Sequence, residues 1–334
     1  MKALLCETIG PAENLVLREL EIPKPSSNQV LIKIHCTGIN YRDCLIIEDK
    51  YQFKGQRPFA PCGEIAGEIV EIGSDVTQFS IGDKVYGELT FGGLCEYIAT
   101  DCTNIEKIPD GINYENAIAM LINYGTSLYS LKQRAKIKKG EKLLVLGASG
   151  GVGIAALQLG KALGAITYGA VSSEDKAKIA FENGADEVFI YPKEIETQEE
   201  KIKLKEDFKK LAGNGGFDVI YDAIGGNYSE AALRSIGWNG RFLVIGFPSG
   251  IPKIPLNLLL VKGCEISGVF FTEFKARQPK EYDENIKQLV ELLSNGSIKP
   301  LISQKYRLED GAKAIMAIKN RQIVGKIIIN NEII

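Results

Sequence analysis

Short runs of alternating apolar and polar residues dominate the first ~120 residues. A two-residue period predicts β-strands with one buried and one solvated face, and Gly, Pro, Asn and Ser between the runs predict turns. The predicted strands are KALLCE, NLVLREL, QVLIKIHC, GEIAGEIVEIG, GDKVYGEL and GGLCEYIAT. We therefore expect a small antiparallel, barrel-like domain here.

The pattern changes near Ala117, where apolar residues begin to recur at helical spacing. Strand and helix patterns then alternate, beginning with KLLVLGAS, GVGIAALQLGKALG, AITYGAVS and SEDKAKIAFENGA. The charged segment 193–211 is expected to be a solvated helix. Such alternation predicts a parallel, doubly wound α/β sheet. From about Thr272 onward, two helices and two strands are expected to return to the first domain.

The stretch LLVLGASGGVGIAALQLGKALGA joins a predicted strand to a predicted helix. Ala148, Gly150 and Gly153 take the three places of a G-x-G-x-x-G fingerprint. Glycine at 150 lets the backbone approach a pyrophosphate, and glycine at 153 lets helix and strand pack closely. The helix N-terminus supplies amide donors for the phosphates. The predicted phosphate-binding residues are Ser149, Gly150, Gly151 and Val152, and the alternative is a tight turn without a ligand.

The next strand ends in GAVSSEDK, without the acidic residue in the position that would hold the ribose hydroxyl of NAD. Ser172 and Ser173 offer hydroxyl donors, and Lys176 can place a positive charge against a ribose phosphate. We therefore predict NADPH as the cofactor. In the alternative interpretation Ser173 is a helix N-cap and Lys176 a solvated residue of the first turn.

Composition narrows the possible partners. The 334 residues suffice for two domains, and 40 Lys and Arg nearly balance 42 Asp and Glu without a basic block. This pattern argues against nucleic acid and favours a small molecule. No apolar run reaches the length of a membrane span, so we expect a cytoplasmic protein that binds no membrane. Seven cysteines without a C-x-x-C pair predict reduced thiols and no structural zinc. The single histidine, His35, is expected in a strand.

The chain resembles the zinc-independent quinone oxidoreductase branch of the medium-chain dehydrogenases/reductases. The matching segments run in order through the whole chain: QVLIKIHCTGINYRD, GEIAGEIVEIGSDVTQFSIGDKVYG, GASGGVGIAALQLGKALGA, SSEDK, GADEVFIY, FDVIYDAIGG, GRFLVIGF and GKIII. The resemblance implies a GroES-like β-rich catalytic domain, residues 1–123 and 268–334, and a Rossmann NADPH-binding domain with a doubly wound parallel sheet, residues 124–267.

Site residues follow from the resemblance, position by position. Asn40 in GINYRD would lie near the nicotinamide, and Tyr51 in EDKYQFK at the substrate mouth is the candidate proton donor. These two are the predicted catalytic residues, although each could instead have a turn or packing role. The further cofactor contacts implied are Thr126, Tyr191, Gly246, Phe247, Val269 and Phe270. Thr126 and Phe270 could also be packing residues.

Zinc-bearing relatives place a cysteine and a histidine where this chain has Asn40 and Gly63. Because zinc prefers thiolate and imidazole ligands, we expect no metal site. Leu45 stands where several quinone reductases have a tyrosine, which implies a more apolar pocket. Cys62 replaces the glycine that usually follows the proline in PFAPCGE, and we assign it no catalytic role.

The expected function is hydride transfer from NADPH to a quinone or an α,β-unsaturated carbonyl, in a cleft between the two domains. One alternative is an enoyl-thioester reductase, for which Arg277 and Lys280 would bind the phosphates of an acyl carrier. A second is an NADPH-binding sensor without useful turnover. The family commonly pairs Rossmann sheets edge to edge, so a homodimer is expected, with the segment from RFLVIGF to CEISGVFF at its edge.

Overall fold

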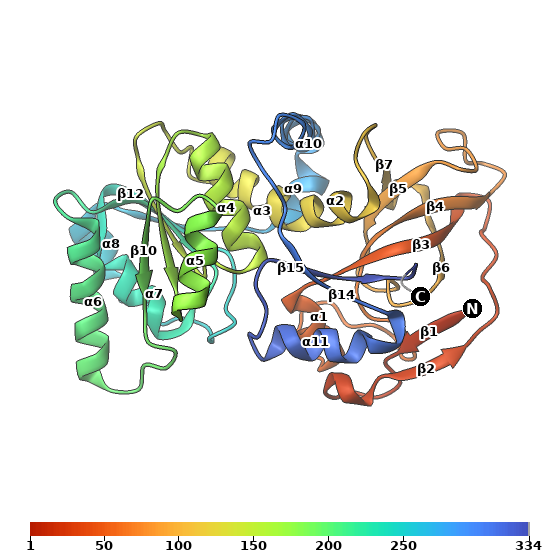
Figure 1. Cartoon of the computed structure of the whole chain (residues 1–334), viewed down its shortest axis with the longest axis horizontal. Coiled ribbons are helices and arrows are strands. Elements are labelled where there is room, and N and C mark those ends of the chain that lie inside the picture. Colours follow the sequence, from red (N-terminus) through yellow and green to blue (C-terminus); the bar gives the residue numbers. More distant parts are fainter. Residues whose placement is uncertain (333–334) are drawn as a thin grey trace. The chain divides into compact units, whose positions relative to one another are not determined.

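A computed structural model describes residues 1–332 and divides the chain into two compact units (Figure 1). The β-rich unit comprises Met1–Ile122 and the chain from Leu301 onward, and the second unit comprises Asn123–Pro300. The first boundary lies one residue from the predicted position. The second boundary lies between residues 300 and 301, so the segment 268–300, which we expected in the β-rich unit, groups with the other one.

The β-rich unit is built around a mostly antiparallel sheet in the order β14-β15-β3-β4-β5-β7, with β6 paired to β3. β1 and β2 form a separate pair. The strands are β1 (Lys2–Leu5), β2 (Val16–Glu19), β3 (Gln29–Ile39), β4 (Glu64–Ile72), β5 (Lys84–Glu88), β6 (Tyr97–Asp101), β7 (Ile105–Lys107), β14 (Ile302–Tyr306) and β15 (Lys326–Asn330). The helices are η1 (Ala12–Asn14), α1 (Tyr41–Ile47), η2 (Cys102–Asn104), α2 (Tyr114–Ala119), η5 (Leu308–Asp310) and α11 (Gly311–Lys319), and the π-helical turn η3 (Met120–Tyr124) crosses the boundary.

All six predicted N-terminal strands are present, and the C-terminal β14, α11 and β15 return to this unit as expected. β3 lies at the centre because most of its residues are buried on both faces, Val30 and Ile32 in one apolar cluster and Ile39 in another. The sequence analysis did not predict α1, whose seven residues follow directly after Asn40.

The second unit contains a parallel sheet in the order β10-β9-β8-β11-β12-β13. Its strands are β8 (Lys142–Leu146), β9 (Ile166–Val171), β10 (Glu187–Ile190), β11 (Phe217–Asp222), β12 (Ile236–Val244) and β13 (Glu265–Gly268). Its helices are α3 (Gly125–Tyr129), η4 (Ser130–Arg134), α4 (Gly151–Ala162), α5 (Glu174–Glu182), α6 (Gln198–Ala212), α7 (Gly226–Leu233), α8 (Asn257–Lys262), α9 (Phe271–Arg277) and α10 (Pro279–Ser294). This is the predicted doubly wound arrangement.

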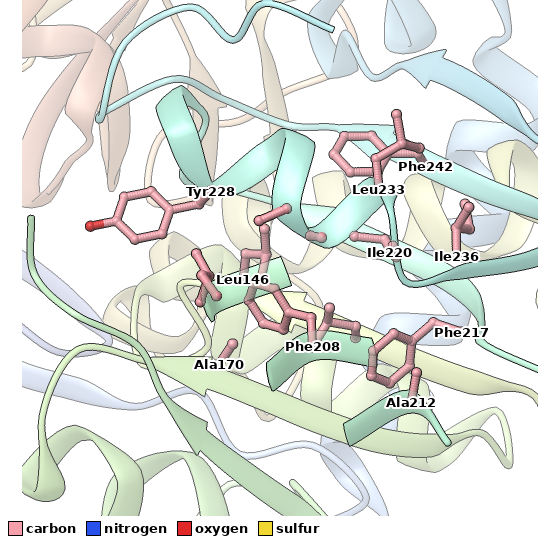
Figure 2. Close-up of a cluster of buried hydrophobic side chains, with 14 of the residues drawn as sticks. Leu146, Ala170, Phe208, Ala212, Phe217, Ile220, Tyr228, Leu233, Ile236 and Phe242 are labelled. Carbon is pink, nitrogen blue, oxygen red and sulfur yellow. The ribbon is translucent and has the colours of Figure 1, made fainter. Parts of the chain in front are cut away.

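A large apolar cluster fixes the parallel sheet against its helices (Figure 2). Phe208 of α6 and Leu233 of α7 pack with Leu146 and Ile220, which project from β8 and β11. On Tyr221, the next residue of β11, the hydroxyl shares a 2.9 Å hydrogen bond with Ser127 of α3. Because successive residues of a strand face opposite sides, helices cover both faces of the sheet.

The segment 268–300 joins the second unit through an aromatic cluster. Phe271 and Phe274 of α9 and Tyr282 of α10 pack with Tyr129 of α3. The rings of Tyr129 and Phe274 stack with their centroids 4.1 Å apart. These contacts hold α9 and α10 against α3, and periodicity could not reveal them. No helix among residues 1–332 is both long and apolar enough to cross a membrane.

Candidate active site

The turn between β8 and α4 contains two glycines with different roles. A Cβ on Gly153 would lie 2.2 Å from the carbonyl oxygen of Gly147, so only glycine allows the helix to start this close to the strand. A Cβ on Gly150, the N-cap of α4, would meet only the Gly147 oxygen, at an ordinary 3.5 Å. Packing within the chain therefore does not require glycine at 150, and the space beside it is free for a ligand.

Two more glycines with open surroundings lie at the carboxyl ends of neighbouring strands. A Cβ on Gly268, the last residue of β13, would meet no atom within 4 Å. A Cβ on Gly246, shortly after β12, would meet only the Pro248 ring, at 4.0 Å. Ligands of doubly wound folds bind outside the carboxyl ends of the strands. Gly150 follows β8 of the same sheet, so all three open positions lie on the side where a doubly wound fold binds a dinucleotide.

Asp222, at the end of β11, is a buried residue that supports the loops beside the predicted site, and the sequence analysis did not predict this role. Its Oδ1 accepts hydrogen bonds from the backbone N–H groups of Ile224 and Gly225, both at 2.9 Å, and its Oδ2 accepts one from the Ser229 hydroxyl at 2.5 Å. Burial raises the pKa of this carboxyl group. The N–H of Ser249 in turn bonds the Ile224 carbonyl, so Asp222 also steadies the loop that carries the predicted Gly246 and Phe247. An acidic residue after the apolar strand FDVIY was the available signal.

The predicted ribose-phosphate residues lie where β9 meets α5. Ser173 is the N-cap of α5, and its hydroxyl accepts a 3.4 Å hydrogen bond from the backbone N–H of Lys176. The capping role considered for Ser173 is therefore present. Ser172 and Lys176 are partly exposed and stay predicted phosphate contacts. Tyr191 follows β10 and is buried, with its ring centroid 4.9 Å from that of Tyr228.

Aromatic residues near the ends of β12 and β13 remain accessible. Phe247 is 42% exposed and Phe270 is 41% exposed, so neither is a core residue. Val269 packs against the aromatic cluster of α9 and α10. Thr126 of α3 is buried, and its carbonyl oxygen accepts a 2.6 Å hydrogen bond from Ser130. Thus Phe270 does not take the packing role that the sequence left open.

Asn40 belongs to the β-rich unit and is held by two charged side chains. Its Nδ2 donates a 2.9 Å hydrogen bond to Glu64, and its Oδ1 accepts a 2.8 Å hydrogen bond from the Lys326 ammonium. Lys326 and Glu64 also form a buried ion pair. The backbone N–H of Asn40 donates to the Asp43 carboxylate at 2.7 Å, which starts α1.

Tyr51, the other predicted catalytic residue, lies in a bend of the same unit and is partly buried. Burial raises the pKa of the Tyr51 phenol. The Arg42 guanidinium lowers this pKa in part, whereas the carboxylates of Glu88 and Asp43 raise it further. Arg42 is itself paired with Glu88 at 2.5 Å. The phenol is therefore protonated at neutral pH, as a proton donor must be.

Comparison with known proteins agrees with this geometry. Residues 26–126 match the sequence family described as alcohol dehydrogenase GroES-like domain, and residues 151–294 match the one described as zinc-binding dehydrogenase. The chain is 35% identical to quinone oxidoreductase-like protein 2 homolog of Nematostella vectensis, over 99% of this chain and 89% of that protein. It is 31% identical to human quinone oxidoreductase, with 94% and 92% of the two chains covered.

The chain belongs to the quinone oxidoreductase family of the medium-chain dehydrogenases/reductases. A solved relative, the Escherichia coli quinone oxidoreductase complexed with NADPH, has a TM-score of 0.89 at 26% identity and covers 99% of this chain and 100% of its own. The GroES-like and Rossmann domains expected from the sequence are thus confirmed, and the chain is an oxidoreductase of this superfamily.

One matched family is described as zinc-binding dehydrogenase, but the residues of this chain at the expected zinc positions do not suit a zinc ion. Asn40 offers an amide, and the adjacent Glu64 carboxylate already holds an ammonium group. At Gly63 a Cβ would lie 1.9 Å from the Leu89 carbonyl oxygen, so this backbone has no room for an imidazole side chain. Among residues 1–332, no group of three or more His, Cys, Asp or Glu side chains could hold a metal ion.

Cys62 has a backbone φ angle of 61°, in the region that favours glycine. Burial, reinforced by Asp43, raises the pKa of the Cys62 thiol well above its ordinary value. A protonated buried thiol is a poor nucleophile, in line with the absence of a catalytic assignment. Arg277, considered for an acyl carrier, is paired with Glu273 at 2.5 Å, and Lys280 is exposed on α10.

Proposed function

We propose that the chain is an NADPH-dependent reductase that transfers hydride to a quinone or an α,β-unsaturated carbonyl. The observation that carries this proposal is the open space beside Gly150, Gly246 and Gly268, glycines that packing does not require, at the carboxyl ends of strands of one parallel sheet. The names of the quinone oxidoreductase relatives and the NADPH in the E. coli structure support it.

The Rossmann unit would bind the cofactor through three groups of atoms. Backbone amides of 149–152, at the N-terminus of α4, would donate to the pyrophosphate. Ser172 and Lys176 would bind the ribose phosphate, with Tyr191 beside it. Thr126 would contact the cofactor, and the nicotinamide would lie against Gly246, Phe247, Val269 and Phe270. When bound, the reduced nicotinamide supplies the hydride.

Asn40 and Tyr51 would act on the acceptor. The acceptor gains two electrons and one hydrogen nucleus with the hydride, and negative charge develops on its carbonyl oxygen. A side-chain N–H of Asn40 can donate a hydrogen bond to that oxygen, which stabilises the charge. Tyr51 then supplies the proton that completes the reduction and takes one back from water. Leu45, partly exposed on α1, would add an apolar wall.

The experiment follows the loss of nicotinamide absorbance with NADPH or NADH and three acceptors: an ortho-quinone, a simple enone and a crotonyl thioester. Quinone or enone turnover with NADPH supports the proposal. Faster turnover of the thioester would instead assign an enoyl-thioester reductase. Tight NADPH binding without turnover of any acceptor would assign a sensor.

The Tyr51→Phe variant tests the proton donor separately. We expect its kcat to fall by at least about 10²-fold, because a positioned acid contributes this much or more. Tyr97→Phe is the matched control, since Tyr97 is another partly exposed tyrosine of the same unit. A Tyr51→Phe enzyme within roughly threefold of the parent would show that water supplies the proton.

We also propose that the protein is a homodimer formed through the edge of its parallel sheet. β13 is an edge strand, hydrogen-bonded only to β12 in its sheet. Nearby, Leu256 and Leu260 are 74% and 84% exposed, and Trp238, Ile251 and Val261 are also exposed. An unpaired strand edge beside exposed apolar side chains is suited to a second copy.

The seven free cysteines support the predicted cytoplasmic location.

A further inference from the structure

Asn40, Glu64 and Lys326 form a closed triangle in which each side chain bonds the other two. Lys326 donates to Asn40 Oδ1 and to Glu64 Oε2, and Asn40 Nδ2 donates to the same Glu64 oxygen. The second carboxylate oxygen, Oε1, accepts the backbone N–H of Ile122 at 3.2 Å. Every one of these groups lies within the β-rich unit.

The register of the central strands brings the triangle together. Glu64 opens β4, Lys326 opens β15, and Asn40 follows the last residue of β3, which lies between the two. Gly38 of β3 pairs with Glu64, and Ile39 pairs with Ile327. A Cβ on Gly38 would lie 2.2 Å from Glu64 Oε2, so glycine leaves the space that the carboxylate fills.

Both charged side chains are almost completely removed from solvent, at 3% exposure for Lys326 and 0% for Glu64. Burial of an ion pair has a large desolvation cost, and apolar residues of similar volume often stabilise a fold equally well. The pair therefore calls for an explanation other than stability. Its third member, the partly exposed Asn40, provides one.

The two charges fix which way the Asn40 amide faces. Rotation by 180° would turn its NH2 group toward the Lys326 ammonium and its carbonyl oxygen toward the Glu64 carboxylate, and both contacts would be repulsive. In the observed orientation one Nδ2 hydrogen bonds Glu64, and the second Nδ2 hydrogen has no partner among the described residues. The amide can therefore present an N–H donor from Nδ2 in a single orientation.

We propose that Lys326 and Glu64 are positioning residues that hold Asn40 as an N–H donor for the carbonyl oxygen of the acceptor. This inference rests on the proposed role of Asn40 in acceptor reduction. The triangle preorganises the donor before charge develops on the oxygen, so no reorientation is needed during the reaction. This role also explains why the Lys326 ammonium group bonds Glu64 Oε2 and Asn40 Oδ1, two oxygens that could otherwise bind a metal ion.

The test removes both charges together, because Lys326→Met alone would leave Glu64 buried without a partner and could prevent folding. In the paired variant Glu64→Gln with Lys326→Met, Asn40 is free to rotate. We expect kcat/KM for the quinone to fall at least about tenfold, mainly through kcat, while the Kd for NADPH changes less than about twofold. Lys313→Met is the control, since Lys313 is an exposed, ion-paired lysine of α11 in the same unit.

A folded paired variant with kcat/KM within about twofold of the parent would overturn the proposal. A second readout is independent of turnover. In protein labelled with ¹⁵N asparagine, the Asn40 side-chain signals are identified by their loss in Asn40→Ser, and one of the two protons should exchange slowly with solvent only in the parent. Equal exchange in the parent and the paired variant would overturn the positioning role. If the parent reduces no acceptor, the proposed function fails, and the exchange measurement still decides whether the triangle holds the amide.

Discussion

A Cβ on Gly153 would lie 2.2 Å from the carbonyl oxygen of Gly147, whereas a Cβ on Gly150 would lie 3.5 Å from the same atom. The distance to this oxygen shows that packing requires glycine at 153 but does not require it at 150. The fingerprint glycines therefore have distinct structural and ligand-binding roles, and these roles can be tested independently.

Gly153→Ala should destabilise the Rossmann unit, and Gly150→Ala should not. The first change forces α4 away from β8, with an overpacking cost of about 1–3 kcal/mol. The second should leave the melting temperature close to that of the parent but weaken NADPH binding by at least about tenfold, because its methyl group occupies the space for the phosphates. Calorimetry and fluorescence titration check the two effects. A Gly150→Ala protein with parental NADPH affinity would remove this turn from the binding site.

Lys176→Ala should weaken NADPH binding by about 1–3 kcal/mol and leave NADH binding nearly unchanged, because only NADPH carries the ribose phosphate. Lys178→Ala is the matched control, since Lys178 is exposed on the same helix. Ser173→Ala is less informative because Ser173 also caps α5, and loss of the cap costs about 1 kcal/mol of stability. Equal losses for both cofactors, measured by fluorescence titration, would exclude Lys176 from the phosphate site.

Stability should decrease above about pH 9. Burial raises the pKa of the Cys36, Cys44 and Cys95 thiols to about 12, from an ordinary value of 9.0. Between these values the unfolded chain has lost thiol protons that the folded chain retains, so the free energy of unfolding falls as pH rises toward 12, by at most ~1.4 kcal/mol per pH unit for each thiol. Below pH 9 the thiols are protonated in both the folded and the unfolded chain, so their contribution to the free energy of unfolding is fully present.

Urea unfolding in reducing buffer between pH 8 and pH 11 measures this dependence. The Cys44→Ala variant should lose stability less steeply with pH than the parent. A Cys44→Ala protein whose stability falls as steeply as that of the parent would contradict the assignment to this thiol.

Leu260→Glu should convert the proposed homodimer to a monomer. Leu260 is 84% exposed on α8, and a carboxylate there would be buried without a partner in the dimer. Phe181→Glu is the control, because Phe181 is an exposed apolar residue on α5, away from β13 in the sheet order. Sedimentation velocity distinguishes the two species. A parent protein that sediments as a monomer would disprove the dimer.

The sequence by itself determined the local elements and the class of fold. Two-residue alternation located the strands of the β-rich unit, and the strand, glycine turn and helix around Gly150 located the cofactor half of the site. These signals are readable because burial of one face imposes a period on neighbouring residues. The charged segment 193–211 was predicted to be a helix, and the observed helix α6 covers Gln198–Ala212, so residues 193–197 lie outside it.

Only the tertiary structure decided which distant side chains meet. Lys326 bonds Asn40 across 286 residues and Glu64 across 262, a contact set by the register of β15, β3 and β4. The alternation of residues within one strand does not indicate which other strand pairs with it. The same limit applies to the segment 268–300, whose aromatic residues pack on Tyr129 of α3 and so place it with the Rossmann unit. Periodicity indicates that a face is buried, whereas the partner of that face is fixed when the elements pack.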